Sequence, residues 1–113
     1  MTTEEAMRYA SVTLMAGGLL VAGYSYAVEM PDLAKKNGCV ACHAIDRKVV
    51  GPAWMDVAKK YKGDSGAEAK LIAKVSKGGS GVWGSASMPP IDPSGKKQDA
   101  IKELVHFILA LGK

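Results

Sequence analysis

The only two cysteines of the chain are separated by two residues in the segment GCVACH, residues 38–43, and a histidine directly follows the second cysteine. Two thiols at this spacing can form a disulfide or a redox-active pair. A Cys39–Cys42 disulfide would close a very short loop, and it would therefore restrain little of the unfolded chain. A redox pair of the thioredoxin type needs a strand-to-helix junction, but no convincing run of alternating β-branched residues follows Cys42. Neither use of the thiols explains the histidine.

The histidine leaves two further kinds of chemistry to consider. A zinc site would use Cys39, Cys42, His43 and His106, but His43 adjoins Cys42 directly, which is awkward for a tetrahedral site. The sequence C-x-x-C-H is also the attachment signature of c-type haem, in which two thiols bond to the vinyl groups and the histidine binds the iron. We therefore predict one covalently bound haem c per chain, with thioether bonds to Cys39 and Cys42 and with His43 as an axial ligand.

A haem iron with one protein ligand needs a second ligand or keeps an open position. Outside the N-terminal segment, the candidates are Met30, Met55, Met88 and His106. Met30 is close to the attachment site, whereas Met55 and His106 lie in segments with helical patterns. Met88 lies in GGSGVWGSASMPP, which has four glycines and two closing prolines and should form neither a helix nor a central strand. The two prolines would hold the thioether in one direction, so the sequence favours Met88 as the second ligand.

The N-terminal segment contains twenty consecutive residues without a formal charge, from Tyr9 to Val28. This run ends in Ser25-Tyr26-Ala27, which places small residues where a signal peptidase requires them. We predict that residues 1–27 are a signal peptide and that residues 28–113 form the mature domain. The alternative is an uncleaved membrane anchor, because twenty uncharged residues just reach bilayer length. In both cases the domain leaves the cytoplasm, and the predicted location is the periplasm.

The charge of the domain indicates the kind of partner that it meets. Residues 28–113 carry fourteen basic and nine acidic side chains, a net charge of +5. This balance favours acidic partners. Nucleic acid is not expected, because the lysines are scattered and Arg47 is the only arginine of the domain. A domain this small is marginal on its own apolar core, so a bound cofactor is expected to complete it. We expect a monomer.

Four helices should position these residues. The spacing of apolar residues and the helix-ending glycines predict helices over residues 31–37, 53–61 and 67–77. A last helix should run from Ser94 or Lys97 to Leu111. The predicted fold class is all-α, with about four short helices and long loops around one haem.

Three segments carry a resemblance to a known family: LAKKNGCVACHAID, VGPAWMDVAKKYKG and GGSGVWGSASMPP. Together they resemble the small bacterial class I cytochromes c, most closely the cytochrome c-551 (cytochrome c8) type, from about Leu33 to Phe107. The resemblance implies the class I cytochrome c fold. It also implies that Cys39 and Cys42 form the thioethers, that His43 is the proximal ligand and that Met88 is the distal ligand.

The resemblance assigns further roles around the haem. Pro52 matches the proline whose carbonyl accepts a hydrogen bond from the ligand histidine. Trp83 matches the tryptophan whose indole N–H reaches a haem propionate, and Lys74 falls where relatives carry a basic residue near a propionate. The chain departs from the family at Ser85-Ala86-Ser87 and in a longer connection before the last helix.

The implied function is electron transfer without catalysis, because two protein ligands leave no open position on the iron for a substrate. The carrier would shuttle between respiratory-chain donors, such as a dehydrogenase or another cytochrome, and a terminal reductase or oxidase. In the resembled fold, a small apolar rim surrounds the haem edge; the candidates here are Val40, Ala41, Val49, Ala86, Pro89 and Pro90. Lysines that could steer an acidic partner are Lys35, Lys36, Lys48, Lys59 and Lys77. The alternatives are a haem enzyme or gas-binding protein with an open sixth position, and a carrier tethered to the membrane by a retained leader.

Overall fold

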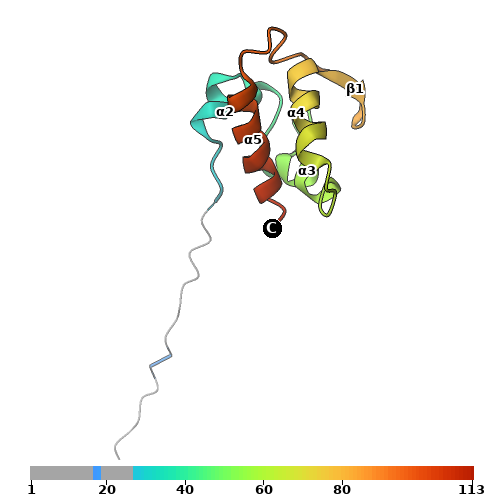
Figure 1. The fold of residues 1–113 in the computed structure, drawn as a ribbon. Helices are drawn as coiled ribbons and strands as arrows, with labels where there is room; N and C mark the ends of the chain where they lie inside the picture. Colours follow the sequence, from blue (N-terminus) through green and yellow to red (C-terminus); the bar gives the residue numbers. More distant parts are fainter. Residues whose placement is uncertain (1–16, 19–26) are drawn as a thin grey trace, which may run out of the picture.

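The computed structural model describes residues 17–18 and 27–113, and Figure 1 shows how their elements are arranged. The elements are helices α2 (Asp32–Lys36), α3 (Trp54–Lys60), α4 (Ala67–Lys77) and α5 (Gln98–Ala110), a 3-10 turn (Cys39–Ala41), and strands β1 (Gly79–Gly81) and β2 (Gly84–Met88). The all-α fold class is therefore confirmed. The predicted signal peptide, apart from Gly17, Gly18 and Ala27, lies outside the described residues. Within the described residues, no helix has the length and apolar character needed to cross a membrane.

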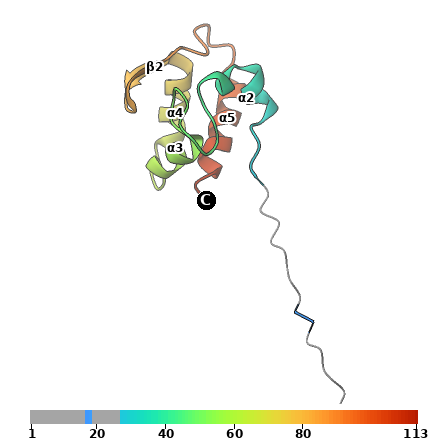
Figure 2. The same ribbon diagram turned by 180° about the vertical axis from the view of Figure 1, so that it is seen from behind.

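Helix α5 is the centre of the helical packing. It contacts α2, α3 and α4, and both ribbon views place it between α2 and α4 (Figures 1 and 2). Its buried face follows the three- and four-residue spacing of a helix, with Ile101, Leu104, Val105 and Ile108 all in the core. The pattern that predicted this helix is thus the pattern that buries it.

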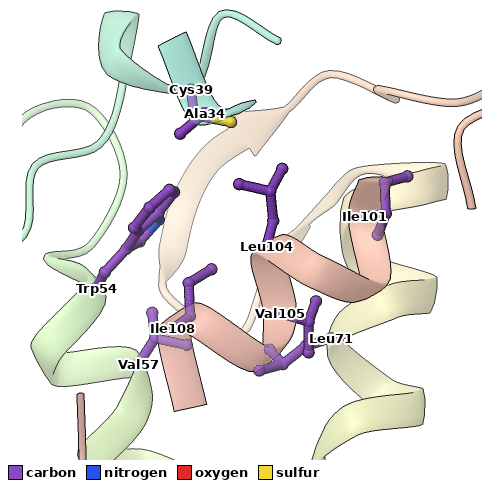
Figure 3. Packing of buried hydrophobic residues seen from close by; sticks show 9 residues of the cluster. All are labelled: Ala34, Cys39, Trp54, Val57, Leu71, Ile101, Leu104, Val105 and Ile108. Carbon is purple, nitrogen blue, oxygen red and sulfur yellow. The ribbon is translucent and has the colours of Figure 1, made fainter. Parts of the chain in front are cut away.

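The core is small and joins all four helices and the 3-10 turn. Figure 3 shows its nine buried residues. They are Ala34, Cys39, Trp54, Val57, Leu71, Ile101, Leu104, Val105 and Ile108. In this view the Cys39 sulfur, the Trp54 ring and the Leu104 side chain point toward one common space. These three residues line one cavity of the structure.

A short hairpin occupies the segment that was expected to form neither a helix nor a central strand. Strands β1 and β2 are antiparallel, with Gly79 opposite Met88 and Gly81 opposite Gly84. The two strands form a separate two-stranded sheet, so neither is a central strand. The sequence did not predict this pairing, because the segment lacks the β-branched alternation that marks strands. The tight turn creates the pairing instead, and Gly81 supports it with a φ of 107°, which side-chain-bearing residues rarely adopt.

Helix α5 begins at Gln98, later than the earliest predicted start at Ser94. Residues 94–97 instead wrap around Asp92, whose side chain is buried. Its carboxylate accepts hydrogen bonds from the Lys96 N–H (2.9 Å), the Lys97 N–H (3.0 Å) and the Gln98 side-chain amide (2.8 Å). A buried carboxylate thus satisfies the backbone N–H groups of the two residues that precede α5.

These contacts predict a loss of stability in acid. The hydrogen bond from the Gln98 amide, with those from the following N–H groups, holds the pKa of the Asp92 carboxyl below its usual range. A lowered native pKa stabilises the fold above the unfolded value of about 4, and the stabilisation is lost as the pH falls through the native pKa. Asp92→Asn should therefore flatten the fall of unfolding free energy below about pH 4, measured by urea titration at a series of pH values. Identical pH profiles for the variant and the natural protein would contradict this expectation.

Candidate functional site

One cavity of about 330 Å³ is lined by all six residues to which the resemblance assigned a role at the haem. Its walls come from the 3-10 turn, the loop before α3, α3 itself, α4, the hairpin and α5. The predicted residues that line it are Cys39, Cys42, His43, Pro52, Trp83 and Met88. The other lining residues are largely apolar and include Trp54, Val57, Leu71, Val75, Leu104 and Ile108. Segments far apart in the sequence thus surround one apolar space.

The 3-10 turn explains the spacing of the two thiols. In a 3-10 helix, residues three apart are eclipsed, so Cys39 and Cys42 emerge on the same side of the backbone. Both thiols are unpaired; Cys39 is buried and Cys42 is half-buried. Burial raises the pKa of the Cys39 thiol, which keeps it neutral in its apolar surroundings. A thioether is also neutral, so the site suits covalent attachment through sulfur.

The loop between Cys42 and α3 sets the orientation of the histidine ring. The Gly51 N–H donates to the Cys42 carbonyl at 2.8 Å, which folds residue 51 back onto the histidine. The His43 Nδ1 lies 2.8 Å from the carbonyl oxygen of Pro52. Because a carbonyl only accepts, Nδ1 carries the proton and the lone pair of Nε2 remains free for a metal ion. The contact predicted for Pro52 is present in the structure.

Gly51 leaves no space beside this ring. A Cβ at residue 51 would lie 2.5 Å from Cε1 of His43, far inside a normal contact. Gly51→Ala should therefore rotate the imidazole away from the Pro52 carbonyl, and we expect a lower reduction potential and a weakened low-spin spectrum. Gly66→Ala is the matched control, because the nearest atom to its Cβ would be 3.4 Å away. Unchanged reduction potentials in both variants would show that the orientation of the His43 ring does not depend on the absence of a side chain at residue 51.

Met88 alone among the sixth-ligand candidates lines the cavity. It ends β2, pairs with Gly79 and is half-buried. Met30 packs against the core cluster, whereas Met55 is exposed. His106 lies on the outer side of α5, where its Nε2 is 3.1 Å from a Glu68 carboxylate oxygen. The structure thus brings Met88, and none of the other three, together with the cysteines and His43.

Trp83 and Lys74 line the cavity, and Lys60 lies over the Trp83 ring. Trp83 is 38% exposed and is not part of the core. The Lys60 ammonium lies 5.6 Å from the centroid of its indole ring, a cation–π distance. Lys74 lines the cavity and is half-buried. Cations in these positions would be suitable partners for the carboxylates of a bound group.

Trp54 is a site residue that the sequence reasoning missed. It is 3% exposed, lines the cavity and lies with its ring centroid 6.0 Å from that of His43. Its ring also makes an edge-type contact with Phe107 of α5, with the centroids 5.9 Å apart. The signal in the sequence was weak: Trp54 and Val57 share one face of α3 by their three-residue spacing. The tryptophan supports the histidine ring from within the core.

The other hollow and the zinc alternative offer no comparable site. A larger, shallow groove of about 860 Å³ lies between α4 and residues 90–98, but no cysteine, histidine or methionine lines it. Among the described residues, no group of three or more His, Cys, Asp or Glu side chains could hold a metal ion. A zinc site built from Cys39, Cys42, His43 and His106 is therefore not formed. Two thiols, an imidazole with a free Nε2, a thioether and apolar walls fit a c-type haem.

Known proteins are similar to this chain over almost all of the described domain. The sequence pattern of the family described as "Cytochrome c" matches residues 29–112. Cytochrome c-551 of Pseudomonas aeruginosa is 44% identical over 102 residues, 90% of this chain and 95% of its own. Cytochrome c-552 of Nitrosomonas europaea is 48% identical over 99 residues, 88% of this chain and 92% of its own.

Solved structures agree with these sequence matches. The crystal structure of wild-type Nitrosomonas europaea cytochrome c552 superimposes with a TM-score of 0.66 at 46% identity, over 71% of this chain and 96% of that one. The class 1 cytochrome MtoD from Sideroxydans lithotrophicus ES-1 gives a TM-score of 0.63 at 38% identity, over 73% of this chain and 91% of that one. The predicted resemblance is confirmed. With its C-x-x-C-H segment in an apolar cavity, the chain belongs to the cytochrome c family, whose members are small electron carriers with a covalently bound c-type haem.

Proposed function

We propose that this protein is a periplasmic electron carrier that exchanges single electrons with acidic redox partners. His43 and Met88 would bind the iron of the haem, and Cys39 and Cys42 would hold the haem by thioether bonds. The haem, when bound, supplies an iron that accepts and returns one electron. The carrier takes electrons from respiratory-chain donors and passes them to a terminal reductase or oxidase.

The main support for the proposal is the lining of one apolar cavity, which contains two thiols, one imidazole and one thioether from separate segments. Because the Pro52 carbonyl holds the His43 proton on Nδ1, Nε2 is ready to bind iron without first losing a proton. A neutral thioether from Met88 raises the reduction potential of such a site. Side chains on both axial positions leave no place for a substrate, which favours electron transfer over catalysis.

Two of the rim candidates, Ala86 and Pro89, line the cavity together with Lys48 and Lys74, and a partner would bind on this side. All six rim candidates are exposed: Val40, Ala41, Val49, Ala86, Pro89 and Pro90. Lys48 lines the cavity and is exposed beside Val49. The five candidate steering lysines are exposed, and Lys35 is the one among these five that has an acidic partner within the described residues, Asp32 at 3.8 Å. Small apolar patches ringed by one sign of charge suit weak and fast complexes.

Two measurements on the purified holoprotein test the proposal. The reduced protein should give the same absorbance spectrum with and without carbon monoxide, because Met88 occupies the sixth position. Its oxidation by ferricyanide, an anionic one-electron probe, should be fast in stopped flow and should slow as salt screens the positive charge. Lys48→Glu should slow this reaction more than Lys113→Glu, which makes the same charge change at the chain end. Carbon monoxide binding by the natural protein would instead favour the haem enzyme or gas-binding alternative.

A further inference from the structure

The segment that follows Met88 is fixed to the end of α4 by backbone hydrogen bonds. The Ile91 N–H donates to the Val75 carbonyl at 3.1 Å, and the Asp92 N–H donates to the Ser76 carbonyl at 3.3 Å. Carbonyls in the last turn of a helix have no partner inside the helix. The chain leaving Met88 supplies those partners, so its position and the end of α4 depend on each other.

Asp92 joins this segment to α5 as well. Its carboxylate, on a residue that is 5% exposed, accepts hydrogen bonds from the Lys96 and Lys97 N–H groups and from the Gln98 side-chain amide. The same Gln98 amide donates to the Ser76 hydroxyl at 2.9 Å. One buried carboxylate therefore ties together the Met88 segment, the last turn of α4 and the first turn of α5.

Only three residues separate Met88 from Asp92, and two of them are prolines. Pro89 and Pro90 have fixed φ angles. A displacement of residue 92 should therefore also displace the backbone at Met88. On the other side of Met88, the hairpin pairs it with Gly79. The thioether is thus held between a weak two-stranded ribbon and a firmly bonded carboxylate.

We propose that Asp92 is a positioning residue for Met88, and that its hydrogen bonds determine how firmly the thioether stays on the iron. The inference rests on the proposed function, in which Met88 is the sixth ligand. Asp92 lies outside the cavity lining and touches neither the haem site nor a reacting atom. It acts through the backbone of residues 89–91.

A purely structural role for Asp92 makes a different prediction, and Asp64 offers a matched control. Asp64 also accepts two hydrogen bonds through its carboxylate, from the Gly66 N–H at 2.8 Å and from the Lys70 ammonium at 2.7 Å. These contacts lie at the start of α4, at the opposite end from the Met88 segment. Asp64→Asn therefore removes comparable hydrogen bonds without disturbing that segment.

The experiment measures the binding of imidazole to the ferric holoprotein, because imidazole competes for the position held by Met88. Asp92→Asn should raise the apparent imidazole affinity about tenfold, the change expected from one lost hydrogen bond to a charged group. Asp64→Asn should stay within about twofold of the natural protein. The absorption band of the sulfur–iron bond should weaken in the Asp92 variant alone. The haem is held by covalent bonds, so even a loosened variant can be measured.

The outcomes separate this inference from the proposed function. Equal imidazole affinities for Asp92→Asn, Asp64→Asn and the natural protein would overturn the positioning role. If the natural protein bound imidazole as tightly as Met88→Ala, Met88 would not be a ligand, and the proposed function would fail together with this inference. Should Asp92→Asn not fold, Ser76→Ala removes the hydrogen bond from Gln98, together with the one that the Ser76 hydroxyl donates to the Ile72 carbonyl inside α4. It should raise the affinity by a smaller factor, and an unchanged affinity there would also overturn the role.

Discussion

Met88→Ala should keep the haem attached but open the iron. Cys39 and Cys42 are unaffected by this change, so the covalent bonds remain. Without the thioether, the reduced protein should bind carbon monoxide and the ferric spectrum should become high-spin. The reduction potential should fall by a sizeable part of the roughly 0.8 V over which axial ligands set haem potentials. Absorbance spectra with and without carbon monoxide, together with a potentiometric titration, measure these changes.

Met55→Ala is the matched control for this substitution. Met55 is 40% exposed at the start of α3 and does not line the cavity, so the spectrum and the potential should match those of the natural protein. Among the other candidates, His106 is paired with Glu68 outside the cavity, and His106→Ala should also leave the spectrum unchanged. A low-spin spectrum that survived Met88→Ala would show that another group binds the iron.

Gly78→Ala should cause the largest loss of stability outside the haem ligands. Gly78 ends α4 with a φ of 69°, where a residue with a Cβ is strained by about 1–2 kcal/mol. Its Cβ would also overlap the carbonyl oxygen of Met88 and press on the backbone of Pro89. Overpacking of this kind adds about 1–3 kcal/mol, so we expect a total loss of about 2–5 kcal/mol in the free energy of unfolding. Urea unfolding followed by circular dichroism measures it.

Gly63→Ala separates the effect of backbone strain on stability from the effect of steric overlap. Gly63 has a φ of 80°, but no atom lies within 4 Å of its Cβ position. This variant should lose only the strain of about 1–2 kcal/mol. In Gly78→Ala, the overlap should in addition push the Met88 backbone and weaken the sulfur–iron absorption band. Equal losses of unfolding free energy in the two variants would mean that the Met88 segment can move away from the added methyl group at residue 78 without a loss of stability.

The helices were predictable from sequence because local rules determine them. Apolar residues at helical spacing predicted α4 over residues 67–77, which is where the structure has it, and α5 to within a few residues. The attachment site was predictable because C-x-x-C-H is contiguous and its 3-10 turn is local. The start of α5 was less predictable, since the Gln98 amide that donates to the buried Asp92 carboxylate also donates to the hydroxyl of Ser76, which lies 22 residues away in the sequence.

The features that the sequence did not predict depend on contacts that leave no pattern in the sequence. The hairpin pairing has no strand-like pattern in the sequence, because glycines and a tight turn create it. Trp54 beside His43 was missed because its role depends on how α3 packs against the loop before it and against Phe107. Gly51 appears in the sequence as an ordinary turn residue, and only the structure places the imidazole against it.

The central claim is a haem bound covalently through Cys39 and Cys42. Its most direct test is the intact mass of the protein purified from the cell envelope and measured under denaturing conditions, which remove any haem that is not covalently bound. We expect the mass of residues 28–113 plus one haem, whereas a full-length chain plus one haem would retain the covalent attachment and make the carrier membrane-tethered. A mass without haem would show that Cys39 and Cys42 do not bind a haem.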